Sequence, residues 1–293
     1  MKKLWTRLRY KQLFGCFVIW FLIYKFINKS DLIRVIQSSL PSREAGLISG
    51  MVWGEKGGIS GDLYRMLRDT GLVHIVVVSG ANLMIIGKCL IENLAKLLGR
   101  KMAIVGGGGV ILLYVNLVGW QIPVIRAVLF LALYYLAQIL GRQFKVGRAI
   151  FFVALLMFLA DFKVINDISF WLSMAAFFGV LLSQKEGVLK NTIWVSLFVL
   201  PILSMYFGRV SILSPITNMG VFFLVEILTV IGFMGSLLGL VSQILGKLVL
   251  MISYPFLRYL IEIVEGIGKI GGVINFQFNW WMLIGWYLIV GAY

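Results

Sequence analysis

His74-Ile-Val-Val-Val-Ser79-Gly80-Ala81-Asn82-Leu83 is a polar stretch inside an apolar run from Leu72 to Ile86. Histidine, serine and asparagine are costly in lipid, because an unsatisfied polar group in a bilayer costs several kcal/mol. These side chains must therefore face other protein or a water-filled path. Small residues here also favour a local break in the helix, which frees backbone groups to line a cavity.

The composition places this stretch in a polytopic membrane protein. The 293 residues are 60% hydrophobic and 13% charged, whereas soluble domains carry about 25% charged residues. The mean hydropathy is +0.96. We predict an all-α fold with about nine or ten transmembrane helices, some broken or amphipathic, because ten spans would use roughly 200 residues. Little remains for a soluble domain, so residues 1–293 are interpreted as a single membrane domain.

The net charge of +15, from 27 basic and 12 acidic residues, has two explanations. Cytoplasmic loops of membrane proteins are rich in lysine and arginine, and much of the excess lies in short loops. A polyanionic partner such as a nucleic acid would also attract basic residues. We favour the first explanation for most of the excess.

The N-terminal part predicts an anchored protein with a cytoplasmic N-terminus. Basic residues precede an apolar run at 13–27, and no small-residue cleavage site follows, so an uncleaved signal anchor is expected. Residues 28–71 are hydrophilic and nearly neutral, which suits an extracytoplasmic segment with a short surface helix from Asp62 to Asp69. The helical core is expected over residues 72–293.

The remaining apolar segments predict the other spans. The second span is expected to begin near Gly71 and to continue as an amphipathic tail. Pro201 predicts a kinked span. Gly235 and Gly239 form a G-x-x-x-G that we place at the junction of two spans, and an amphipathic segment is expected over 258–266. The later spans are predicted at 102–119, 121–141, 149–165, 168–184, 191–208, 212–233, 235–254 and 278–293.

Several polar residues lie at membrane depth, where an ionisable side chain indicates either function or a structural pair. Glu226 lies about 20 Å into its predicted span at 1.5 Å per residue. Arg126 lies in the first turns of another, where the helix dipole disfavours a cation. It therefore needs an acidic partner or an anionic ligand. Asn218 is interpreted as an interhelical hydrogen-bonding group.

Three kinds of chemistry find little support in the sequence. Ser79 as a nucleophile would need a base, but His74 would lie about 140° away around one helix. Gly246-Lys247 lacks the spacing and the Ser or Thr of a phosphate loop. One histidine and two cysteines without a CxxC disfavour a zinc site. We therefore expect no enzyme and no cofactor.

Four blocks of the sequence together resemble the ComEC/Rec2 family of competence proteins. They run in family order from about residue 40 to residue 265, which is most of the chain. The blocks are Thr70 to Gly80, Pro123-Val124-Ile125-Arg126-Ala127 with Leu140-Gly141-Arg142, Ile168-Ser169-Phe170-Trp171-Leu172-Ser173, and Tyr206-Phe207-Gly208-Arg209-Val210-Ser211 with Pro215 and Asn218.

The resemblance implies a multi-pass protein of the cytoplasmic membrane that conducts single-stranded DNA inward during natural transformation. It also implies a separate cytoplasmic motor, separate DNA-receptor proteins and a possible homo-oligomer. Family members often have Leu-His after the Ser-Gly pair, where this chain has Ala81-Asn82. Many also carry OB-like and metallo-β-lactamase-like domains, for which this chain lacks room. Degradation of the second strand is therefore expected from another protein.

The resulting hypothesis is a DNA channel with a lining of named residues. His74, Ser79, Gly80 and Asn82 would shape a constriction, and Arg126 would attract phosphate. Ser169, Arg209, Asn218 and Glu226 complete the candidate channel residues. The alternative is a small-solute or ion-coupled transporter that uses the broken second span and Glu226.

Overall fold

The computed structural model describes residues 27–75, 78–183, 187–208, 210–211 and 213–291. Within them the fold is helical, as predicted, apart from a single two-stranded antiparallel ladder. That ladder joins β1 (Val210–Ser211) to β2 (Val273–Ile274). Nearly all of the predicted signal anchor at 13–27 lies outside the described residues.

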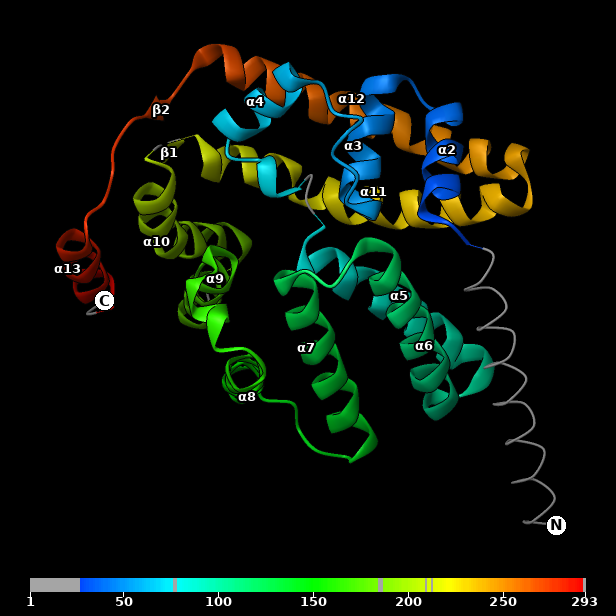
Figure 1. Ribbon diagram of the computed structural model, residues 1–293, viewed down its shortest axis with the longest axis horizontal. Helices are drawn as coiled ribbons and strands as arrows, with labels where there is room; N and C mark the ends of the chain where they lie inside the picture. The colour runs from blue at the N-terminus through cyan, green and yellow to red at the C-terminus, as the bar shows by residue number, and fades with distance from the viewer. Residues whose placement is uncertain (1–26, 76–77, 184–186, 209, 212, 292–293) are drawn as a thin grey trace.

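The helices form an upper and a lower group (Figure 1). In the upper group, the long helices α11 and α12 lie side by side, with three shorter helices packed near them. The upper group is α2 (Lys29–Ser39), α3 (Ser42–Trp53), α4 (Gly61–Asp69), α11 (Ser214–Val241) and α12 (Gln243–Ile270). The lower group is α5 (Gly80–Leu98), α6 (Arg100–Val118), α7 (Ile122–Ile139), α8 (Val146–Ala160), α9 (Ile168–Ser183), α10 (Gly187–Phe207) and α13 (Trp280–Gly291). The short 3-10 helices are η1 (Val73–Ile75) and η2 (Phe162–Asn166).

Helix α3 lies at the centre of the main core, although the sequence predicted a hydrophilic segment there. Every residue from Glu44 to Trp53 is buried. The Trp53 indole stacks near the rings of Tyr114 and Phe233, with centroids 5.6 and 5.8 Å away. Its Nε1 donates to Ser236 Oγ at 3.2 Å. The segment 28–71 thus contributes a core helix, while its surface helix near 62–69 is confirmed as α4.

The structure corrects three predicted boundaries, two of them in the α11–α12 hairpin. We placed a junction between spans near Gly235, yet α11 continues to Val241 and the turn is at Ser242. Small residues inside a membrane helix let another helix approach closely, and Gly235 does this: a Cβ there would lie 2.8 Å from Leu250 Cγ. The amphipathic segment 258–266 is likewise part of α12 and not a separate element. The predicted second span also differs, because its helix begins at Gly80 and not near Gly71.

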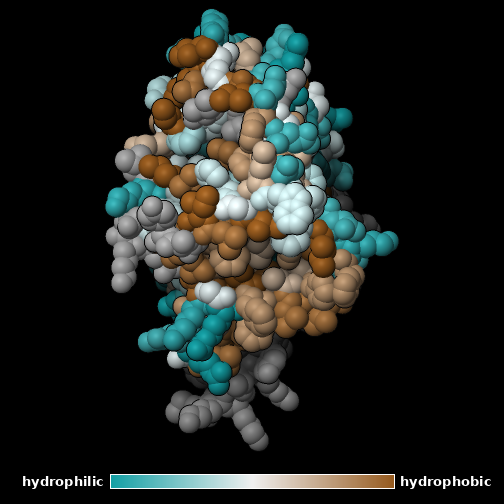
Figure 2. All heavy atoms as spheres, turned by 90° about the vertical axis from the view of Figure 1, so that its left-hand side faces the viewer, coloured by the Kyte–Doolittle hydropathy of each residue, from teal (hydrophilic) through white to brown (hydrophobic). Residues whose placement is uncertain are grey.

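The chain is a multi-pass membrane protein by helix length and composition. Among the described residues, five helices are long and apolar enough to cross a bilayer: α6, α7, α11, α12 and residues 190–207 of α10. Three shorter apolar helices are α8, α9 and α13. Figure 2 shows hydrophobic residues across the middle and lower part of one face, a hydrophilic group near the lower end, and a mixture of hydrophilic and hydrophobic residues at the top. The total of nine or ten crossings stays a prediction.

Helix α13 compensates for the proline inside α10. Pro201 has no N–H, so the carbonyl of Leu197 loses its partner within the helix. The Trp286 Nε1 donates to this Leu197 oxygen at 3.0 Å, and the Tyr287 hydroxyl donates to the Phe198 oxygen at 2.6 Å. Neighbouring helices often satisfy backbone groups that a proline frees in a membrane. Two side chains of α13 therefore hold it against α10 at the turn before Pro201.

Replacing Trp286 by phenylalanine is expected to lower the free energy of unfolding by about 1 kcal/mol, because the Leu197 carbonyl loses its donor. In a Pro201→Ala background the restored amide N–H can serve that carbonyl, so the same replacement should cost clearly less. Thermal unfolding in detergent of the unchanged protein, the two single variants and the double variant gives the coupling free energy between Trp286 and Pro201. Equal losses in both backgrounds would contradict this role of Trp286.

Candidate functional site

The Ser79-Gly80 pair forms the start of helix α5. Ser79 is extended, with φ −91° and ψ 157°, and its Oγ accepts the Asn82 N–H at 3.1 Å. A serine at this position satisfies one of the N–H groups that a helix start leaves free. The predicted break in the apolar run is therefore confirmed. His74 lies in η1 just before it, and its side chain is outside what the structure describes.

Replacing Ser79 by alanine is expected to lower the free energy of unfolding by about 1 kcal/mol, the usual cost of losing a helix cap. Ser79→Thr keeps an acceptor oxygen and should lose less. Thermal unfolding of the purified variants measures both changes. Lost activity in a Ser79→Ala protein of normal stability would instead indicate a reacting hydroxyl.

Asn82 joins α5 to the buried end of α3. Its side chain is fully buried, and Nδ2 donates to the Met51 oxygen at 2.9 Å. The Tyr114 hydroxyl donates to the next carbonyl, that of Val52, at 2.6 Å. The last carbonyls of a helix have no partner within it, so these two side chains close the end of α3 inside the core. Asn82 is sealed from solvent here, and its place at a constriction stays a prediction.

Gly80 brings the first sequence block against the second. A Cβ on Gly80 would lie 3.2 Å from Ala127 Cβ and 3.3 Å from the Pro123 oxygen, both on α7. Such spacing leaves almost no room for a side chain. The start of α5 therefore packs directly on the first turns of α7, the helix that carries Arg126.

Arg126 connects the second block to the third. Its Nη1 donates to the Ser169 oxygen at 3.1 Å. The Ser169 N–H in turn donates to Asp167 Oδ1 at 2.6 Å. Among the described residues this is the one hydrogen bond that the Arg126 side chain makes. A guanidinium has five N–H donors, so most of them have no partner among the described residues.

Two exposed tryptophans lie on the segments that flank this arginine. Trp120 precedes α7 and is 53% exposed, with Nε1 donating to Asn116 Oδ1 at 3.0 Å. Trp171 on α9 is 42% exposed, with Nε1 donating to the Ile165 oxygen at 2.6 Å. A hollow of about 480 Å³ adjoins Trp120, Ile125 and Asp167. The hydrogen bonds fix both indoles while leaving ring surface uncovered.

The fourth block contacts the first at the start of α11. The Thr217 hydroxyl donates to the Thr70 oxygen at 2.9 Å, and a Cβ on Gly71 would collide with Ser214. Asn218 donates from Nδ2 to Ser214 Oγ at 3.1 Å. Its bond is thus within α11, whereas we predicted a bond between helices. Arg209 lies outside the described residues.

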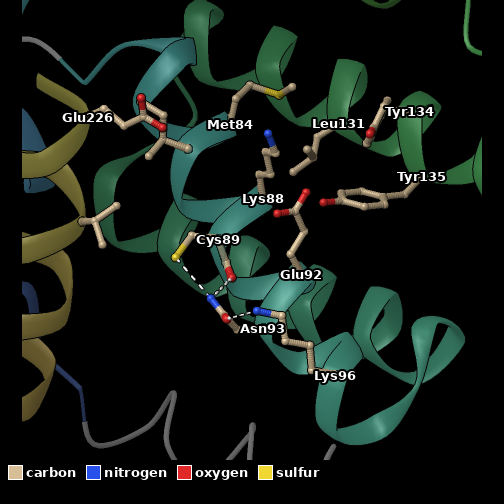
Figure 3. Close-up of a pocket in the computed structure, with 12 residues that line it drawn as sticks. Met84, Lys88, Cys89, Glu92, Asn93, Lys96, Leu131, Tyr134, Tyr135 and Glu226 are labelled. Carbon is tan, nitrogen blue, oxygen red and sulfur yellow. Dashed lines mark hydrogen bonds between the residues drawn. The ribbon is translucent and has the colours of Figure 1, made fainter. Parts of the chain in front are cut away.

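Glu226 lies apart from these contacts. It is exposed on α11 and lines a separate groove, about 610 Å³ in volume, with side chains of α5 and α7 (Figure 3). The structure therefore packs Gly80 of α5 on α7 and joins Arg126 of α7 to Ser169 in the first turn of α9. Asn82 instead faces α3, and Glu226 lies elsewhere. The sequence predicts only an amphipathic tail to the second span here, and an amphipathic helix alone does not indicate a groove that two other helices share.

The comparisons with known proteins agree with the four blocks. The family model described as "Competence protein" matches residues 51–293. A protein of Aquifex aeolicus described as uncharacterized is 31% identical over 137 residues, which are 47% of this chain and 32% of the relative. ComE operon protein 3 of Bacillus subtilis is 26% identical over 207 residues, 67% of this chain and 27% of the relative.

The matched region is less than a third of the length of either relative. No solved structure matches the chain. The family match nevertheless covers most of the sequence and includes all the blocks on which the resemblance rests. This chain is a membrane protein that belongs to the competence protein family.

Proposed function

We propose that this protein passes single-stranded DNA across the cytoplasmic membrane during natural transformation. The match of the competence family model to residues 51–293 carries the proposal. A separate receptor would deliver the strand, and a separate cytoplasmic motor would supply energy. The chain itself would act without a catalytic site and as a homo-oligomer, as the family resemblance implies.

The arrangement around Arg126 supports this proposal. A path for single-stranded DNA needs cations for the phosphates and aromatic surfaces on which bases stack. Arg126 has unused donors, and Trp120 and Trp171 keep part of their ring surface exposed. Each lies within or beside a block on which the family resemblance rests.

Basic residues in the turns of the lower helix group support the proposal that this end of the protein faces the cytoplasm. Arg100 at the start of α6 donates from Nε and Nη2 to Gln138 Oε1, at 3.2 and 2.6 Å. This bond joins the α5–α6 turn to the end of α7. Lys101, Arg142, Lys145 and Arg148 are exposed in the neighbouring turns. Short basic loops remain on the cytoplasmic side. The basic residues before the predicted anchor support a cytoplasmic N-terminus in the same way.

Entry of labelled DNA into cells with and without this protein tests the proposal. In a transformable host that lacks the gene, label is expected to stay outside the cytoplasm, and a plasmid copy should restore its entry. Surface binding of duplex DNA should be unchanged, since a receptor performs that step. Normal entry of label in the deletion strain would contradict the proposal.

A small-solute or ion-coupled transporter is the second candidate, favoured by Glu226 in its groove. For the DNA channel we expect Glu226→Gln to leave DNA entry intact. Glu262→Gln on α12, another exposed carboxylate, is the control. If Glu226→Gln abolishes an ion-coupled flux that Glu262→Gln retains, while DNA entry persists, the transporter is the better account.

A further inference from the structure

The groove that contains Glu226 lies between α5, α7 and α11 (Figure 3). Each helix supplies one or more polar groups: Lys88 and Glu92 from α5, Tyr135 from α7 and Glu226 from α11. Apolar side chains of the same helices complete the wall, among them Met84, Leu131 and Val230. The groove thus combines charges of both signs with a surface that suits hydrocarbon.

Asn93 and Lys96 in this groove make hydrogen bonds within α5, whereas four other polar side chains have no partner in the part of the chain that the structure describes. Among the described residues, Lys88, Glu92 and Glu226 have neither an ion pair nor a hydrogen bond from their side chains. Tyr135 is 6% exposed, and its hydroxyl oxygen is buried with no hydrogen-bond partner. Figure 3 shows this hydroxyl directed toward Glu92. Charged groups on membrane helices usually pair with one another, so these four side chains are arranged for an outside partner.

The mixture of charges restricts what that partner can be. A simple cation would be repelled by Lys88 and Lys96, and a simple anion by Glu92 and Glu226. A molecule with both an anionic and a cationic group satisfies all of them. A primary ammonium donates hydrogen bonds to carboxylates, and a phosphate accepts them from an ammonium or a tyrosine hydroxyl.

We propose that this groove binds the headgroup of a phospholipid of the phosphatidylethanolamine class. Its phosphate meets Lys88, its ammonium meets Glu226, and its acyl chains lie along the apolar wall. Two of the three helices, α7 and α11, are candidate membrane spans, so a lipid reaches the groove from the bilayer. The site is independent of the proposed DNA path around Arg126.

The thiol of Cys89 lines the groove and can report its occupancy. The full chain, with Cys16→Ser as the one background change, is reconstituted in phosphatidylcholine vesicles that contain either phosphatidylethanolamine or phosphatidylglycerol. We expect maleimide to label Cys89 about tenfold more slowly with phosphatidylethanolamine, because hydrogen bonds to charged groups hold the headgroup. Phosphatidylcholine lacks the ammonium N–H donors, and phosphatidylglycerol lacks the cation.

Variants test which side chains give the protection. Lys88→Gln and Glu226→Gln should each abolish it, and both side chains are exposed, so the fold should be kept. Lys101→Gln, an exposed lysine outside the groove, should retain it. Equal labelling in all three lipids, protection by phosphatidylglycerol, or protection that survives Glu226→Gln would overturn the proposal. Protection by soluble phosphoethanolamine in plain phosphatidylcholine vesicles would overturn a lipid as the occupant.

Discussion

Leucine in place of Gly246 is expected to prevent the accumulation of folded protein. A Cβ on Gly246 would lie 2.7 Å from the Gly239 nitrogen and 3.0 Å from the Gly235 oxygen, both in the backbone of α11. Backbone cannot rotate away as a flexible side chain can, so the two helices must separate. We expect a loss of about 3 kcal/mol or more, at the upper end of overpacking effects. The yield of monodisperse protein in detergent and its thermal unfolding measure this loss.

Gly266 in the same helix provides the matched control. It is exposed, and a Cβ there would meet nothing within 4 Å. Gly266→Leu should be neutral or slightly stabilising, since leucine is a better helix former than glycine. Similar losses for Gly246→Leu and Gly266→Leu would contradict the close packing of α11 on α12.

Local signals in the sequence predicted some helices well. The span predicted at 121–141 corresponds to α7, Ile122–Ile139. Pro123 suits the first turn of a helix, and Gly141 adopts the positive φ of 65° that favours glycine after a helix end. Both signals depend on neighbours along the chain, and so a single sequence carries them.

Other elements depend on contacts between distant segments. A G-x-x-x-G such as Gly235 and Gly239 can either end a helix or let another helix pack closely against it. The motif alone does not distinguish these outcomes, and here the packing of α12 shows that it is the second. Helix α3 is buried by α2, α11 and α12, although its own residues include Arg43 and Glu44. Its burial could not be inferred from its composition.

The candidate site was predicted only in part for the same reason. The break before α5 follows from Ser79-Gly80, which are small and polar within an apolar run. The partner of Arg126 is a backbone oxygen 43 residues away, and no local pattern indicates it. The groove around Glu226 likewise needs three helices to come together.

Alanine in place of Arg126 is expected to reduce DNA entry about tenfold or more, because a guanidinium with free donors contributes a charge-assisted bond to phosphate. Binding of a labelled single-stranded oligonucleotide to the purified protein, followed through a salt titration, should weaken for all sequences. The slope of log affinity against log salt concentration should become less steep by about one, which corresponds to the loss of one phosphate contact. Arg148→Ala, in an exposed turn at the start of α8, should change entry much less.

Arg126 also braces α9 through the Ser169 oxygen, and this second role must be separated from the first. Loss of that bond alone would lower the free energy of unfolding and leave the salt slope unchanged. Arg126→Lys keeps the charge while losing the planar donor geometry, so it should restore the salt slope even if stability stays low. A normal slope and normal entry in a stable Arg126→Ala protein would leave Arg126 as a structural brace, and the phosphate path would have to lie elsewhere in the chain.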